Sequence, residues 1–192
     1  MKTKEITITA IFIAITLILA LIPNLGIIQI GAISITIMHL PVIVAALTLN
    51  RKQTLIIALC FGFCSWLVAL TRAITPMDLL FQNPLVAIIP RFLFGLAATY
   101  LATIFKQEKL RVVFTATIAT LIHTILVLST VIIAGPELFG VVDFSGGIVS
   151  LWTLIITVIS SNGIIEMLVS AIVMLPLVRA VNTISNKTII KT

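Results

Sequence analysis

The chain has 192 residues, of which 60% are hydrophobic and only 9% are charged, and its mean hydropathy is +1.30. Because a soluble domain carries about 25% charged residues to keep its surface in water, this composition excludes a water-soluble protein and predicts a membrane protein. The net charge of +6 does not indicate nucleic-acid binding, because the cationic residues flank apolar runs instead of alternating with aromatic residues in one basic patch.

Six apolar runs, separated by short polar breaks, follow one another along the chain. A helix needs about 20 apolar residues to cross about 30 Å of hydrocarbon. The predicted spans are residues 5–23, 32–50, 53–71, 84–105, 111–134 and 150–181. We therefore predict an all-α membrane protein, with residues 1–192 forming one bundle of six transmembrane helices. The last run, of about 32 residues, exceeds one crossing, so we expect it to project from the membrane or to break near Gly163.

The cationic residues predict the orientation of this bundle, because Lys and Arg are retained on the cytoplasmic side of membrane proteins. Ten of the twelve fall at the N-terminus, in alternate breaks and at the C-terminus: Lys2, Lys4, Arg51, Lys52, Lys106, Lys109, Arg111, Arg179, Lys187 and Lys191. Of the other two, Arg72 lies in a loop on the opposite side and Arg91 lies within a span. Both termini are therefore predicted to be cytoplasmic, and the protein is predicted to be a multi-pass protein of the cell membrane.

Polar side chains within the spans are the candidate functional residues, because polar groups at membrane depth are costly and usually face the interior of a bundle. Helical rise places six of them between the midplane and the outer surface. They are His39, Trp66, Arg91, His123, Asn162 and Glu166. Their shared depth predicts one polar pocket that opens outward.

Arg91 carries the clearest constraint, because an unpaired guanidinium in hydrocarbon costs several kcal/mol. We expect Arg91 to pair with Glu166 or with an anionic ligand. Asn162 and Glu166 are four residues apart and share one helical face, beside Gly163, which permits close approach of a backbone or a ligand. A hydrogen bond between helices is the competing interpretation for the Asn and His residues, and packing is the competing interpretation for Trp66.

Small residues recur at a spacing of four in two of the predicted spans. Ala10 and Ala14 form such a pair in the first span, and Ala98 and Ala102 form another in the fourth. These pairs let helix backbones approach closely, within the bundle or against another protein.

These features resemble the substrate-binding (S) components of energy-coupling factor (ECF) vitamin transporters, over essentially the whole chain. The resemblance is carried by residues 37–43 (IMHLPVI), by Pro90, Arg91 and Gly95, and by residues 162–166 (NGIIE). Within the family, residues 80–86 (LFQNPLV) and the stretch from Gly62 to Trp66 are most similar to the pantothenate S component.

The resemblance implies a protein that binds a vitamin with high affinity in an outward-facing pocket. It also implies partners, namely a transmembrane coupling protein and two cytoplasmic ATPase subunits, so that ATP is hydrolysed by the partners and this chain is not an enzyme. No cofactor and no metal site are expected. By the same resemblance, Ala10 and Ala14 contact the coupling protein, and the loop at residues 24–31 is a lid over the pocket.

Pantothenate has a carboxylate, an amide, hydroxyls and a gem-dimethyl group. Arg91 would bind the carboxylate through its fork of donors, and Trp66 would cover the gem-dimethyl group. We expect the amide and the hydroxyls to contact polar side chains, with His39 as a further ligand contact: Asn162, His123, Gln82 or Asn83. Because a carboxylate repels an anionic ligand, Glu166 is expected to orient Arg91 or Asn162.

Three alternatives remain open at this point. A thiamine precursor such as hydroxymethylpyrimidine, or folate, would keep the family but would make Glu166 the principal contact of a pyrimidine ring. A stand-alone carrier or channel would work without partners. An intramembrane enzyme would use His39, His123 and Glu166 as a metal site or an acid–base pair, although their spacing matches no known motif of that kind.

Overall fold

The computed structural model describes residues 3–23, 25–30, 33–73, 79–138 and 163–190. Its long helices are α1 (Thr3–Leu21), α3 (Arg51–Thr71), α5 (Pro84–Leu101), α6 (Glu108–Leu138) and α8 (Ile164–Ile190). Within the described residues, these five helices are long and apolar enough to cross a membrane. The protein is therefore a multi-pass membrane protein, and the predicted spans at residues 5–23, 53–71, 84–105 and 111–134 are confirmed as helices.

The prediction for the second span, at residues 32–50, was wrong in its first half, where one two-stranded hairpin stands within a bundle of helices. Strands β1 (Ile27–Ile30) and β2 (Ile33–Thr36) pair in antiparallel fashion, and helix α2 covers only Leu40–Thr48. The cause is local sequence, because isoleucine alternates with Ser and Thr over residues 33–37, which is a strand pattern of β-branched residues. Pro41 then stands in the first turn of α2, where its missing N–H costs nothing.

The last span differs from its predicted position, 150–181, at its end. Helix α8 begins at Ile164, directly after Gly163, and continues to Ile190. Residues 150–162 of the predicted span, Asn162 among them, lie outside the described residues.

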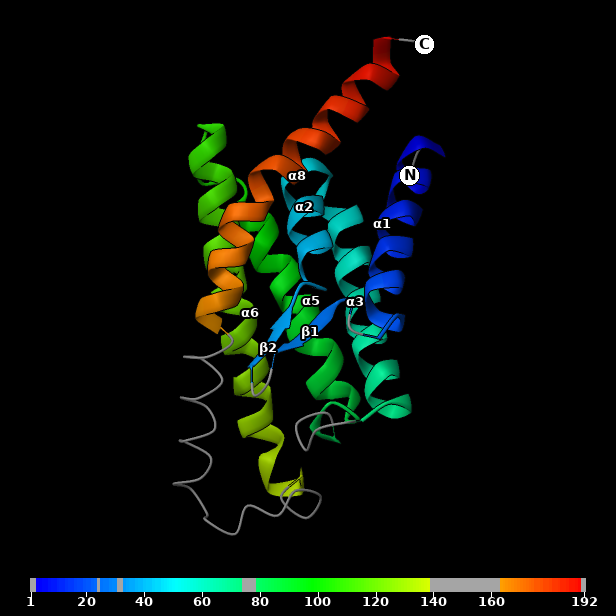
Figure 1. Ribbon diagram of the computed structural model, residues 1–192, viewed down its shortest axis with the longest axis vertical. Coiled ribbons are helices and arrows are strands. Elements are labelled where there is room, and N and C mark those ends of the chain that lie inside the picture. The colour runs from blue at the N-terminus through cyan, green and yellow to red at the C-terminus, as the bar shows by residue number, and fades with distance from the viewer. Residues whose placement is uncertain (1–2, 24, 31–32, 74–78, 139–162, 191–192) are drawn as a thin grey trace.

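Helix α2 is the centre of the bundle, and Figure 1 shows it between α8 and α1, with the hairpin at mid-height. It packs against α1, α3, α5, α6 and α8. Its residues from Leu40 to Ala45 are all buried, as expected for a short helix that is apolar on every side. Any side chain at the N-terminus of α2 therefore lies deep within the protein.

Helices α3 and α5 approach closely because each contributes a glycine to their contact. A Cβ on Gly62 would lie 2.9 Å from Cα of Ile88, and a Cβ on Gly95 would collide with Cβ of Ala58. Because neither glycine has a side chain, the backbones of α3 and α5 come close together at both positions.

One end of the bundle is held by polar contacts between α1 and the turn that joins α2 to α3. Asn50 and Gln53 form a capping box at the start of α3. Gln53 also donates to Glu5 O and Thr9 Oγ1, both at 3.0 Å, and Asn50 Nδ2 donates to Glu5 Oε1 at 3.3 Å.

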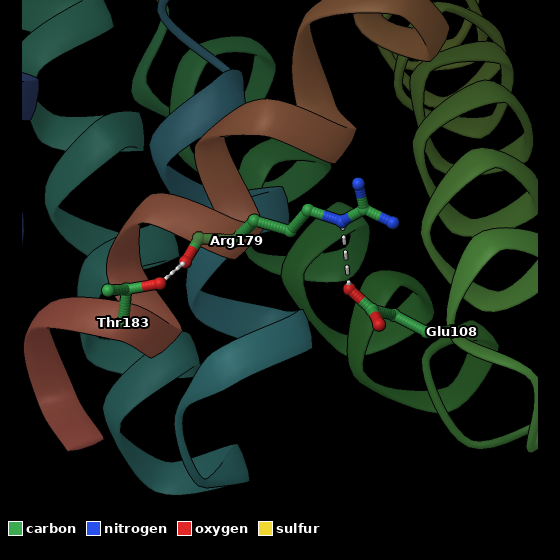
Figure 2. Close-up of polar contacts among 3 residues, drawn as sticks. All are labelled: Glu108, Arg179 and Thr183. Carbon is green, nitrogen blue, oxygen red and sulfur yellow. Dashed lines mark hydrogen bonds and ion pairs between the residues drawn. The ribbon is translucent and has the colours of Figure 1, made fainter.

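The start of α6 and the second half of α8 meet at the same end. Arg179 Nε lies 3.5 Å from Glu108 Oε1, and Thr183 Oγ1 donates to Arg179 O at 2.8 Å (Figure 2). The start of α1 and the end of α8 both lie at this end in Figure 1.

Candidate functional site

The backbone around Arg91 explains how a guanidinium is held inside the bundle. In a helix the carbonyl of Val86 would accept a hydrogen bond from residue 90, but Pro90 has no N–H. Arg91 Nη1 donates to this carbonyl instead, at 2.9 Å. Pro90 therefore leaves the carbonyl of Val86 without its helical donor, and the next residue, Arg91, donates to this carbonyl from its side chain.

Aromatic rings flank the same guanidinium. Cζ of Arg91 lies 4.6 Å from the ring centroid of Phe81 and 5.9 Å from that of Phe61. Both distances are within the range of cation–π attraction. Arg91 is 6% exposed, and its Nε has no hydrogen-bond partner among the described residues.

Of the two partners expected for Arg91, Glu166 does not pair with it in the structure, and an anionic ligand stays a prediction. Among the described residues the ion pair found joins Arg179 and Glu108, and no described carboxylate lies within ion-pair distance of Arg91. Glu166 Oε1 instead accepts a hydrogen bond of 2.7 Å from the backbone N–H of Thr36, at the end of β2. Glu166 therefore joins α8 to the hairpin, and Arg91 has no carboxylate partner in the described part of the chain.

His39 and His123 lie side by side, and the ring of Phe61 contacts both His123 and Arg91. Their rings stack at a centroid distance of 5.7 Å and an interplanar angle of 15°. The ring of Phe94 lies 4.9 Å from that of His123, and the ring of Phe61 lies 5.7 Å from it. Nδ1 of His39 and Nε2 of His123 are buried and have no partner in the described structure.

The other ring nitrogen of His39 is held by hydroxyls from two helices. Its Nε2 lies 3.1 Å from Ser170 Oγ and 3.2 Å from Thr120 Oγ1, and these hydroxyls are 3.1 Å apart. His39 immediately precedes α2, so this triangle joins α2 to α6 and α8. It fixes the orientation of the imidazole. The polar groups of Arg91, His39 and His123, each with an atom that lacks a hydrogen bond in the described structure, thus lie among three phenylalanines.

Three of the other predicted contact residues use their polar groups within the protein. Trp66 Nε1 donates to Gln82 O at 2.9 Å, and Gln82 Nε2 donates to Ala69 O at 3.2 Å. Asn83 caps α5 and accepts from the N–H of Leu85. These residues fasten the end of α3 to the start of α5. Their role as ligand contacts, like that of Asn162, stays a prediction.

Ala10 and Ala14 lie on the exposed side of α1. They share it with large apolar side chains, including Ile6, Ile11 and Ile18. The inward side of α1 is formed by Thr9, Phe12, Thr16 and Ala20. The small pair is therefore available to lipid or to another protein.

Sequence reasoning missed the aromatic residues and the hydroxyls of the site: Phe61, Phe81, Phe94, Thr120 and Ser170. A helical-spacing signal existed for three of them. Phe94 follows Arg91 by three residues, Thr120 precedes His123 by three, and Ser170 follows Glu166 by four, so each shares a helical face with a polar residue that was singled out. Within the described residues, no group of three or more His, Cys, Asp or Glu side chains is placed to hold a metal ion.

A bundle of apolar helices with a buried guanidinium and two underbonded imidazoles at its centre has the chemical groups that a small polar ligand would need in a membrane protein. The model of the family described as "ECF transporter, substrate-specific component" matches residues 4–178. The chain therefore belongs to this family, as the sequence motifs indicated.

Among characterised relatives, the chain is similar to the pantothenate transporter PanT of Leuconostoc mesenteroides subsp. mesenteroides. The two are 38% identical over 99 residues, which are 50% of this chain and 48% of the relative. The match thus covers about half the length of the relative.

Proposed function

We propose that this protein binds pantothenate as the S component of an ECF importer. The observation that carries the proposal is Arg91, a buried cation between two aromatic rings that no described carboxylate neutralises. An anionic ligand supplies the missing charge, and pantothenate is a monocarboxylate. Similarity to a pantothenate transporter over half the chain supports the same ligand.

The remaining groups of pantothenate match the groups beside Arg91. His39 Nδ1 and His123 Nε2 lack partners, and an imidazole nitrogen can donate to or accept from an amide or a hydroxyl. Phe61 and Phe94 offer an apolar surface for the gem-dimethyl group. In this proposal Asn162, Gln82, Asn83 and Trp66 lie farther along the same ligand or at its entrance.

Glu166 serves the hairpin in this proposal. Its Oε1 accepts from the Thr36 N–H, and a pyrimidine ligand would instead use the remaining acceptor sites of the carboxylate. We propose that Glu166 positions the hairpin and leaves the ligand to Arg91 and the two histidines.

The proposed transport cycle needs other proteins. The chain acts as a single unit in the cell membrane, with both termini in the cytoplasm, and joins a transmembrane coupling protein and two ATPase subunits that hydrolyse ATP. Ala10 and Ala14 are proposed to contact the coupling protein, which is supported by their exposure on α1 and by the close backbone approach that small residues permit.

The test is calorimetric titration of the detergent-purified protein with pantothenate, hydroxymethylpyrimidine and folate, without ATP. One-to-one binding of pantothenate alone is expected, and Arg91→Gln should abolish most of it, because a buried charge pair is worth about 2–5 kcal/mol when one partner is removed. Binding of hydroxymethylpyrimidine or folate in place of pantothenate would show that the protein has a different ligand from the one proposed. Uptake by the chain expressed without partners would indicate a stand-alone carrier.

A further inference from the structure

Phe81 lies in the segment that precedes α5, outside any long helix, yet its ring is the one nearest to the guanidinium of Arg91. Two hydrogen bonds hold this segment against the end of α3. Trp66 Nε1 donates to Gln82 O, and Gln82 Nε2 donates to Ala69 O. The position of Phe81 is therefore set by its sequence neighbour Gln82.

The guanidinium is constrained on two sides by this arrangement. Nη1 is directed at the carbonyl of Val86, and Cζ faces the ring of Phe81 at 4.6 Å. A guanidinium binds a carboxylate with two parallel hydrogen bonds, through either the Nη1–Nη2 edge or the Nε–Nη2 edge. Because Nη1 is engaged and Nε has no partner among the described residues, the Nε–Nη2 edge is the one that can receive a carboxylate.

We propose that Phe81 is a positioning residue that holds the guanidinium of Arg91 with its Nε–Nη2 edge toward the ligand, and so makes the site selective for a carboxylate. This proposal rests on the proposed pantothenate function. Trp66 and Gln82 act through Phe81, by holding its segment against α3. Loss of the ring leaves the guanidinium free to change rotamer, and the two parallel hydrogen bonds then lose their alignment.

A role in packing alone predicts a different result from a role in positioning Arg91. If Phe81 only fills space, its loss weakens every ligand of the site to the same extent. If it orients the guanidinium, its loss weakens a carboxylate ligand and spares the matching neutral ligand. Pantothenol, in which a primary alcohol replaces the carboxylate of pantothenate, is the matching neutral ligand.

The experiment compares the dissociation constants of pantothenate and pantothenol by calorimetry for the wild-type protein and for Phe81→Leu, Phe81→Tyr and Trp66→Phe. Phe81→Leu should weaken pantothenate about 3- to 30-fold, the range expected for loss of a partly desolvated cation–π contact, and should change pantothenol less than twofold. Phe81→Tyr keeps the aromatic face and should restore the wild-type ratio of the two constants. Trp66→Phe should shift the ratio in the same direction as Phe81→Leu and by less.

Phe63→Leu is the matched control, because Phe63 is a phenylalanine of α3 that is 45% exposed on the bundle surface. It should leave both constants unchanged. Equal weakening of the two ligands by Phe81→Leu, or no weakening of either, overturns the positioning role while the pantothenate function stands. Failure of the wild-type protein to bind pantothenate overturns the proposed function itself. If Phe81→Leu does not fold, the ratio of the dissociation constants of pantothenate and pantothenol in Trp66→Phe tests the positioning role in its place.

Discussion

The contact between Glu166 and Thr36 gives a prediction that does not depend on the identity of the ligand. Thr36 pairs with Ile27 in the hairpin, and the next residue, Ile37, donates its N–H to Gly26 O at 2.9 Å. Because successive N–H groups of an antiparallel strand point to opposite sides, the N–H of Thr36 points away from β1 and toward α8. Glu166 Oε1 accepts this hydrogen bond at 2.7 Å, a bond that Glu166→Ala removes.

The magnitude follows from the burial of this contact. Glu166 is 7% exposed, and leaving a buried donor without its acceptor costs about 1–3 kcal/mol. That free energy corresponds to about a 5- to 150-fold increase in the population in which the end of β2 leaves α8. Glu166→Gln keeps an oxygen acceptor but loses the charge, which about doubles the strength of a hydrogen bond, so its effect should be about half as large in free energy.

Amide hydrogen exchange, read at Thr36 by mass spectrometry or NMR in detergent, measures this opening directly. The exchange rate at Thr36 should rise by about the stated factor in Glu166→Ala and by less in Glu166→Gln. Glu108→Ala removes a carboxylate at one end of α6 that has no contact with the hairpin, and it should leave the rate unchanged. A wild-type rate at Thr36 in Glu166→Ala would refute the conclusion that Glu166 holds the hairpin to α8.

Three further predictions concern contacts between helices. Gly95→Leu should prevent α3 and α5 from packing, because even a Cβ at this position collides with Ala58, and a loss of folded protein in size-exclusion chromatography would show this. Ser170→Ala should lower the free energy of unfolding by about 1–2 kcal/mol, since the hydroxyl loses its hydrogen bonds to His39 and Thr120; denaturant titration in mixed micelles measures it, and an increase would contradict the account. A double-mutant cycle of Arg179→Ala and Glu108→Ala should give a coupling below about 1 kcal/mol, as for other exposed ion pairs, and a larger value would show that the pair is shielded from solvent.

Hydropathy predicted five of the six spans, the last of them with different bounds, because composition alone decides whether a long apolar helix can form. The prediction of the second span was wrong because residues 32–50 have the apolar content of a helix, but their apolar residues recur with two different periods. Residues 33–37 alternate as a strand, and only the part from Leu40 onward is helical. Hydropathy does not distinguish these periods, and the hydrogen bond from Thr36 at the end of β2 to Glu166 of α8 is a tertiary contact that no local pattern reveals.

The candidate site was predicted in part, for a related reason. The depth of a residue in the membrane follows from its distance to the end of a span, so the convergence of His39, Arg91 and His123 could be predicted. The partner of a residue depends on how each helix is rotated about its axis. Glu166 was therefore assigned to Arg91, although α8 directs it to the hairpin. The bond from Arg91 to Val86 could have been inferred from Pro90, which leaves that carbonyl without its helical donor.

The distribution of satisfied and unsatisfied polar groups connects the fold to the proposed function. At one end of the bundle Gln53 joins α3 to α1. At the other, Arg72 Nη2 donates to Ala20 O at 2.8 Å and Trp66 donates to Gln82 O. Between these ends lie the underbonded atoms of Arg91, His39 and His123, while Arg111 Nε and Thr115 Oγ1 near the start of α6 also lack a partner among the described residues. Leaving a buried polar atom unpaired costs stability. In the proposed function, a ligand with a carboxylate and further polar groups completes the hydrogen bonds of Arg91, His39 and His123, and so offsets this cost.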